Sequence, residues 1–329
     1  MSEVPCSMAR PGAPGQTPSA GSIAAPGTAL GAAPNLTWTY AKLALTGVIW
    51  GGTFIAGRIV AAEAAPFSAA FLRFVIASLV LAAVLYRSAG GFPKLPRRQW
   101  LPVLLLGLSG VFFYNYFFFA GLETITAGRA SLIIATNPVV IAVLAAALFR
   151  EPLHPLKLAG IFLSMSGAMV VISRGDPTAM FHGGVGLGEF YIFGCVASWV
   201  AYSLIGKIAM RDLSPLAAVT YSCLVGMFCL APPAFAEGLA GALTAYGAAT
   251  WLGLLYLGLF GSAIGFIWYY QGIRVIGPSR AGVFINIVPV SALVLAFLIL
   301  AEPIDGSLFV GALLVGAGVT CTNRGKLPA

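Results

Sequence analysis

Few side chains of this chain are placed to perform covalent chemistry. Its two histidines, His154 and His182, lie between apolar segments and stand beside no nucleophile or set of metal ligands at a usable spacing. The five cysteines include no pair at metal-ligand spacing, and no phosphate-binding loop is present. We therefore expect no catalytic residue, no metal, no cofactor and no enzyme activity. A membrane-embedded enzyme is the weaker alternative, and it would require a cluster of buried histidine and carboxylate side chains.

A second group of polar and aromatic side chains suits reversible binding. These residues lie inside long apolar segments, where such a group is expected to face a cavity or another helix. We predict that the following residues contact an amphipathic or aromatic metabolite: Trp50, Thr53, Arg73, Tyr114, Asn115, Asn137, Trp199, Tyr202, Trp268 and Asn286. Ordinary packing of rings between helices is the alternative interpretation.

Arg73 is the only basic residue well inside an apolar segment. A charge there is expensive and generally faces the interior of a helix bundle. It could hold a substrate carboxylate through two parallel hydrogen bonds, or it could bond freed helix carbonyls and be structural. The equivalent position in the second half of the chain is Ser222, so the role of Arg73 is not duplicated.

Two prolines interrupt apolar segments at equivalent places. Pro138 lies midway along 126–149, and Pro289 lies midway along 278–300. Proline has no N–H to donate and its ring kinks a helix. We predict that both prolines act as hinges beside a substrate chamber, with ordinary packing kinks as the alternative.

The elements that position these residues are membrane-spanning helices. The chain is 59% hydrophobic and 9% charged, whereas soluble domains have about 25% charged residues. A helix needs about 20 apolar residues to cross a bilayer. Ten segments satisfy this: 40–61, 66–86, 100–121, 126–149, 156–173, 187–206, 215–236, 251–271, 278–300 and 307–323. Residues 1–38, rich in Ala, Gly, Pro and Ser, are predicted to be a disordered tail, and 324–329 a short C-terminal tail.

The segments form a tandem duplication. Residues 100–318 contain matching positions 151 apart, such as Trp100 with Trp251, and the spacing upstream is 149, as for Trp50 and Trp199. Such duplication in an apolar chain is typical of transporters. We predict one repeat over residues 39–173 and a second over 187–323.

Basic residues predict the orientation. Most of the 18 Lys and Arg residues fall on segments that are cytoplasmic if both termini are cytoplasmic, and only Arg58, Arg129 and Arg174 fall outside. Each repeat has five spans, an odd number, so the repeats are predicted to be inverted. The basic residues are scattered singly, which argues against a nucleic-acid partner. All ten acidic residues lie in the tail, in loops or near span ends, which mildly favours exchange or uniport over proton coupling.

These features resemble the drug/metabolite transporter superfamily, and its EamA-type group in particular. The resemblance rests on Trp50-Gly51-Gly52-Thr53-Phe54, on Pro66 with Arg73, and on the elements Pro138 to Glu151 and Pro289 to Glu302. It covers residues 40–323. It implies an all-α membrane protein of ten transmembrane helices, arranged as two inverted five-helix repeats around a central cavity.

The function that this resemblance implies is secondary transport by alternating access. We expect a multi-pass protein of the cell inner membrane that moves amino acids or related metabolites, with export as the favoured direction. The resemblance further implies a cavity lined by the first, third, fourth, sixth, eighth and ninth spans. The expected partners are a small-molecule substrate and the lipid bilayer, and a homodimer is left open. A non-transporting membrane scaffold or sensor is the alternative.

Overall fold

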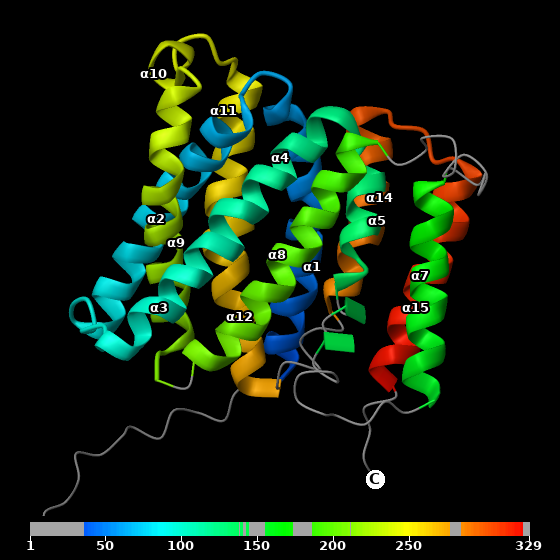
Figure 1. Ribbon diagram of the computed structural model, residues 1–329, viewed down its shortest axis with the longest axis horizontal. Helices are drawn as coiled ribbons and strands as arrows, with labels where there is room; N and C mark the ends of the chain where they lie inside the picture. Colours follow the sequence, from blue (N-terminus) through cyan, green and yellow to red (C-terminus); the bar gives the residue numbers. More distant parts are fainter. Residues whose placement is uncertain are drawn as a thin grey trace, which may run out of the picture. The chain divides into compact units, whose positions relative to one another are not determined.

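The computed structural model describes residues 36–137, 139–140, 143–144, 155–173, 186–210, 212–276 and 284–324. Within these ranges every regular element is a helix (Figure 1). The predicted all-helical fold is therefore confirmed. The predicted tail 1–38 lies outside the described residues up to residue 35, and the first helix begins at Leu36, four residues before the predicted start.

Helices of the first half follow the five predicted spans. The third span is divided into three consecutive elements. The bounds are α1 (Leu36–Ala61), α2 (Pro66–Ala89), α3 (Arg97–Leu106), η1 (Gly107–Phe113), α4 (Tyr114–Thr124), α5 (Ala127–Ile134) and α7 (Pro155–Ile172).

Helices of the second half repeat this order, with one short additional helix, α10, after the second span. The bounds are α8 (Leu187–Ala209), α9 (Pro215–Ala236), α10 (Leu239–Ala242), α11 (Ala248–Leu255), η3 (Tyr256–Ile264), α12 (Gly265–Ile276), η4 (Phe284–Asn286), α14 (Ile287–Leu300) and α15 (Gly306–Arg324).

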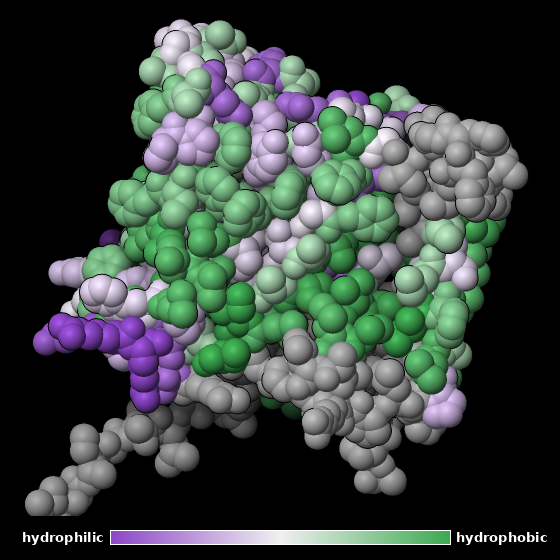
Figure 2. All heavy atoms as spheres, viewed as in Figure 1, coloured by the Kyte–Doolittle hydropathy of each residue, from purple (hydrophilic) through white to green (hydrophobic). Residues whose placement is uncertain are grey.

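The outer surface suits lipid. Six helical spans in the described ranges are long and apolar enough to cross a membrane, and shorter apolar helices accompany them. Large apolar side chains such as Phe162, Phe228 and Leu298 are about 70% exposed. Figure 2 shows hydrophobic side chains across the middle of one face, with hydrophilic ones above them and at the lower left. Apolar side chains on this outer face can contact the hydrocarbon tails of lipids.

Equivalent residues of the two halves begin equivalent helices. Pro66 starts α2 and Pro215 starts α9, where a missing N–H costs nothing because the first turn has no partner for it. Ser214 also caps α9, since its hydroxyl accepts from the N–H of Ala217.

The halves also pack on each other through equivalent contacts. A Cβ added to Gly107 would lie 2.7 Å from Val225 Cγ1, and one added to Gly258 would lie 2.7 Å from Ile76 Cβ. Gly258 is the duplication equivalent of Gly107, and Val225 is the duplication equivalent of Ile76. The third span of each half therefore lies against the second span of the other, at a distance that only glycine permits.

Contacts along α1 and α4 show that these helices run in the same direction. Phe54 packs against Phe118 with ring centroids 5.4 Å apart. One turn further along both helices, the guanidinium of Arg58 donates to the carbonyl of Leu122.

Helix α8 runs in the opposite direction to α3 and α4. The carboxylate of Asp212, which follows α8, accepts from Arg98 at the start of α3. Gly188, at the start of α8, lies against Thr124 at the end of α4. The first helix of the second half therefore runs antiparallel to α1 (Figure 1).

Glycines bring α7 and α15 close together. Gly167 leaves room for the backbone of Val315, and Gly318 leaves room for the backbone of Gly160, whose carbonyl would lie 2.6 Å from an added Cβ. Small residues allow this approach in membrane helices.

The structure revises the predicted proline kinks. Pro289 is buried, but it lies in the first turn of α14, after the 3₁₀ turn η4, and not midway along a continuous helix. A proline fits there because a first-turn N–H has no helical partner. Pro138 lies outside the described residues. Helix α5 ends at Ile134, four residues before it.

Candidate functional site

The third span of each half contains a π-helix at its centre. The wider turns cover Gly107–Phe113 in the first half and Tyr256–Ile264 in the second. π-helical turns are rare and are frequently found at functional sites. The apolar pattern of the sequence does not predict these turns, and the two segments position the polar residues around Arg73.

Arg73 lies in the interior and bonds to both third spans. Its Nε donates to Ser262 Oγ at 2.9 Å, and its Nη1 donates to Asn115 Oδ1 at 2.9 Å. The residue is only 6% exposed. In the described part of the chain no carboxylate lies within ion-pair distance of it. A buried guanidinium held by neutral acceptors alone is costly.

The π-helical backbone orients both acceptors of Arg73. Asn115 donates through Nδ2 to the carbonyl of Val111 at 2.8 Å, which turns its Oδ1 toward Arg73. Ser262 donates to the carbonyl of Leu257 at 3.0 Å, which leaves its lone pairs for the same guanidinium. Asn115 and Ser262 therefore each donate to a carbonyl of a π-helical turn, and each accepts a hydrogen bond from the guanidinium of Arg73.

Gly261 is the point where three predicted residues meet. The indole N–H of Trp50 donates to the Gly261 carbonyl at 2.9 Å. A Cβ on Gly261 would lie 2.7 Å from Thr53 Cγ2 and 3.7 Å from Arg73 Nη2. A Cβ at this position would therefore force Thr53 to move and would lie in van der Waals contact with Arg73.

An aromatic cluster lies next to this point. The ring of Trp50 lies 6.1 Å from Trp199, 5.9 Å from Phe266 and 5.1 Å from Tyr269. The ring of Trp199 also lies 5.5 Å from Tyr114. We call Trp50, Tyr114, Trp199, Phe266 and Tyr269 the aromatic cluster.

Tyr202 lies at the edge of the aromatic cluster. Its ring is 5.5 Å from that of Trp199 and packs on Gly110, in the equivalent of the contact between Thr53 and Gly261. The structure thus brings together Trp50, Thr53, Arg73, Tyr114, Asn115, Trp199 and Tyr202, as one connected group of side chains.

The remaining predicted residues lie elsewhere. Trp268 is half-buried on α12 and takes part in none of the ring contacts described for that cluster, where Tyr269 is found instead. Asn137 is buried after α5, and its Oδ1 has no hydrogen-bond partner among the described residues. Asn286 is half-buried in η4.

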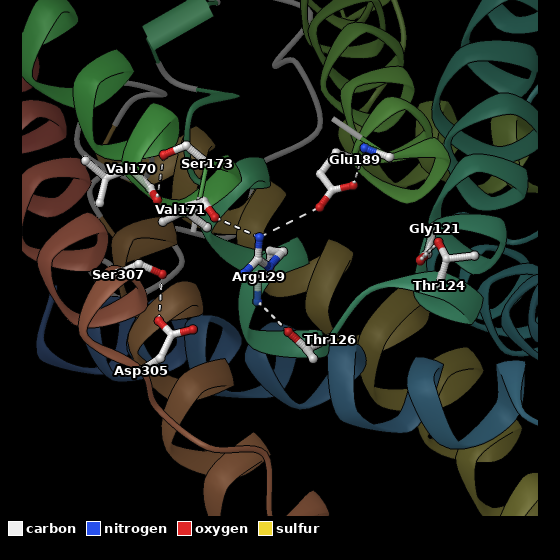
Figure 3. A network of polar contacts seen from close by, with 11 residues as sticks. Gly121, Thr124, Thr126, Arg129, Val170, Val171, Ser173, Glu189, Asp305 and Ser307 are labelled. Atoms are coloured by element: carbon white, nitrogen blue, oxygen red, sulfur yellow. Dashed lines mark hydrogen bonds and ion pairs between the residues drawn. The ribbon is translucent and has the colours of Figure 1, made fainter. Parts of the chain in front are cut away.

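A second polar network, shown in Figure 3, was missed by the sequence analysis. Arg129, predicted to fall on the outer side, is 6% exposed at the start of α5, and Glu189 is 4% exposed at the start of α8. Arg129 Nη1 lies 3.8 Å from Glu189 Oε1 and donates to the carbonyl of Val171, at the end of α7, at 2.8 Å. The network thus connects the two halves.

Carboxylates at neighbouring helix ends extend this network. Glu302 accepts from the backbone N–H groups of Ala127 and Gly128, at the start of α5, at 3.1 and 3.3 Å. Burial alone would raise the pKa of Asp305, but hydrogen bonds from Ser307 and Leu308 and the charge of Arg129 lower it below its usual value. A helix N-terminus favours such carboxylates.

Among the described residues no group of three His, Cys, Asp or Glu side chains is arranged to hold a metal ion. The arrangement favours binding of a small anionic or aromatic group at Arg73 and the aromatic cluster.

Comparison with known proteins shows which family of membrane proteins this chain resembles. The model of the EamA-like transporter family matches residues 37–173 and 186–324. The uncharacterized transporter YyaM of Bacillus subtilis is 28% identical over 83% of this chain and 89% of its own length. A probable terminal-alkyne amino-acid exporter of Streptantibioticus cattleyicolor is 32% identical over 87% of this chain and 93% of its own length. A solved crystal structure with 20% identity superposes with a TM-score of 0.61 over 86% of this chain and 95% of that one, which is a likeness of fold alone.

Proposed function

Because this chain belongs to the EamA-like transporter family of the drug/metabolite transporter superfamily, we propose that it is a secondary carrier that exports amino acids or related small metabolites. A multi-pass membrane protein of this class needs a site for its substrate and a means of closing either side. Arg73 with the aromatic cluster is the proposed site.

Arg73 is the single observation that supports this site best. Its guanidinium is buried beside neutral acceptors, and the described residues supply no counter-charge. A substrate carboxylate would supply the missing negative charge through charge-assisted hydrogen bonds. The amphipathic remainder of the substrate would then pack on Trp50 and Trp199.

An amino acid matches the chemistry next to Arg73. Its ammonium group can lie over the faces of Trp and Tyr rings, which attract cations, while its carboxylate meets the guanidinium. The name of the Streptantibioticus relative points to the same class of substrate. Because that relative is 32% identical, the particular side chain accepted by this carrier is left to experiment.

Alternating access would arise from two five-helix units in opposite orientations. The antiparallel course of α1 and α8 and the equivalent glycine contacts support this arrangement. With both termini in the cytoplasm and the chain in the inner membrane, the Arg129–Glu189 network lies at the outer side. We propose that this ion pair holds the outer side closed.

The test is transport by purified protein in liposomes. We would measure counterflow of amino acids, amines and nucleosides, with and without a pH gradient. The proposal predicts counterflow of at least one amino acid, and it predicts that the corresponding amide, which lacks the carboxylate, is not carried. Counterflow of amines or nucleosides alone would overturn the proposed substrate class, and no counterflow of any of them would favour a scaffold or sensor.

A further inference from the structure

An apolar groove lies between α2 and α9, away from the aromatic cluster. It encloses about 320 Å³ and is lined by Phe71, Leu79, Ala82, Leu224, Phe228 and Ala231, among others. Leu79 is 68% exposed and Phe228 is 69% exposed, so the groove opens on the outer surface. The substrate site uses none of these side chains.

The groove has the dimensions of one lipid chain. Phe71 and Ala82 are eleven residues apart on α2, a length of about 17 Å along a helix. The hydrocarbon of one leaflet is about 15 Å deep, half of the full bilayer core. An acyl chain lying along α2 would therefore fill the groove from one end to the other.

The two ends of the groove differ in charge. Three exposed basic residues that make no ion pair within the described ranges lie where α2 is joined to α3: Arg87 in the last turn of α2, Lys94 in the connection and Arg97 at the start of α3. The hydroxyl of Tyr221, one turn before Leu224 on α9, donates to the carbonyl of Pro93, which places this connection beside the groove. Hydrophilic side chains gather at the lower left of Figure 2, where α2 meets α3 in Figure 1.

The opposite end is acidic. Glu237, which follows α9, accepts from the backbone N–H groups of Phe67 and Ser68 at 3.1 and 2.7 Å. An anionic group is therefore repelled at the start of α2 and attracted at its end.

We propose that the groove between α2 and α9 binds one acyl chain of an anionic phospholipid, whose phosphate lies against Lys94 and Arg97. The basic end fixes the direction of the lipid, and the apolar groove fixes its position. This inference needs only the membrane location of the chain and does not depend on the proposed substrate.

A second copy of the chain suits this surface less well. Two copies related by a two-fold axis along the membrane normal would place their basic ends side by side, and like charges across an interface oppose association. A lipid phosphate meets the same residues with opposite charge.

The experiment is a titration of the purified full-length protein in detergent with palmitoyl-oleoyl phosphatidylglycerol or phosphatidylcholine, followed by native mass spectrometry. The wild-type protein should retain one phosphatidylglycerol in preference to phosphatidylcholine. Lys94→Gln should weaken retention of phosphatidylglycerol about fivefold, and the Lys94→Gln/Arg97→Gln pair about 30-fold, since each basic residue near a membrane surface contributes about 1 kcal/mol.

Lys42→Gln is the matched control, because it removes one basic charge on α1 beside Gln271 of α12, and neither of these helices lines the groove. Ala82→Phe, which fills the groove, should weaken retention of phosphatidylglycerol without changing the basic end. Equal retention of the two lipids by the wild type, or equal effects of Lys94→Gln and Lys42→Gln, would overturn the proposal. A wild-type dimer that Ala82→Phe dissociates would overturn it in favour of self-association.

Discussion

Helices α2 and α9 occupy equivalent places in the two halves but differ in what they bury. Both begin with proline, and both meet the π-helix of the opposite half through glycine contacts 2.7 Å from an added Cβ. In the buried face of α2 lies Arg73, whereas at the equivalent position α9 has Ser222, which bonds within its own helix to the Val219 carbonyl. Duplication therefore preserved the packing of these helices, while the charge that we propose binds substrate is present in α2 and not at the equivalent position of α9.

The largest expected effect is that of removing this charge. Arg73→Gln should lower counterflow of the carboxylated substrate by about 10- to 100-fold, because hydrogen bonds to a charged group contribute about 1.5–3 kcal/mol. Ser222→Ala, the matched control, should keep most of the activity. Thermal melting should show Arg73→Gln no less stable than wild type, since the buried charge lacks a counter-charge in the described region. A large loss of stability would instead make Arg73 structural.

The next effect concerns the Arg129–Glu189 ion pair, which we propose closes the outer side. Arg129→Gln and Glu189→Gln should each raise the rate at which an impermeant maleimide, added outside, modifies a cysteine replacing Thr53. We expect the labelling rate to rise about tenfold, which corresponds to a shift of about 1.4 kcal/mol in the equilibrium between the closed and open outer side. Leaving one buried charge unpaired costs more than this. The background would lack the native cysteines. Unchanged labelling in both variants would remove this pair from the closure of the outer side.

Glycine substitutions should separate packing from binding. Gly107→Ala and Gly258→Ala each force a methyl group against the opposite helix and should destabilise the fold by about 1–3 kcal/mol. The Cβ of residue 258 would also lie 2.8 Å from the backbone carbonyl of Arg73. Only Gly258→Ala should therefore raise KM for the carboxylated substrate by a few-fold. Equal KM changes in both variants would show that Arg73 is insensitive to this contact.

The smallest effect is expected at Glu63, outside the membrane-spanning helices. Hydrogen bonds from Thr250 and from the Gly247 backbone lower the pKa of this carboxyl. A lowered folded-state pKa adds stability above the unfolded value of about 4.3, and that stability is lost as pH falls through the folded pKa. Glu63→Gln should lower Tm by about one degree at pH 7, and the effect should shrink as pH falls through the folded-state pKa of Glu63. An equal shift at every pH would contradict this linkage.

Much of the fold could be predicted because the repeat and the lengths of the apolar segments can be read from the sequence without knowing which residues are in contact. The equivalence of Trp50 and Trp199 follows from the duplication, and their rings lie 6.1 Å apart; their contact with substrate stays a prediction. The π-helices could not be foreseen, because a widened turn leaves no periodic signal. Such a turn also shifts the helical phase of the residues after it, so Tyr269 and not Trp268 joins Trp50. The pairing of Arg129 with Glu189 could not be predicted, because the two residues lie 60 positions apart in the sequence and on different helices.

The most direct test of the account is the sidedness of two equivalent carboxylates. Glu63 accepts from Thr250, and Asp212, its duplication equivalent, accepts from Gln99, the equivalent of Thr250. Single cysteines at positions 63 and 212, in a background without native cysteines, would be exposed to an impermeant maleimide in intact cells. The account predicts labelling of position 63 from outside and of position 212 only after permeabilisation. Labelling of both positions from the same side would contradict two oppositely oriented halves.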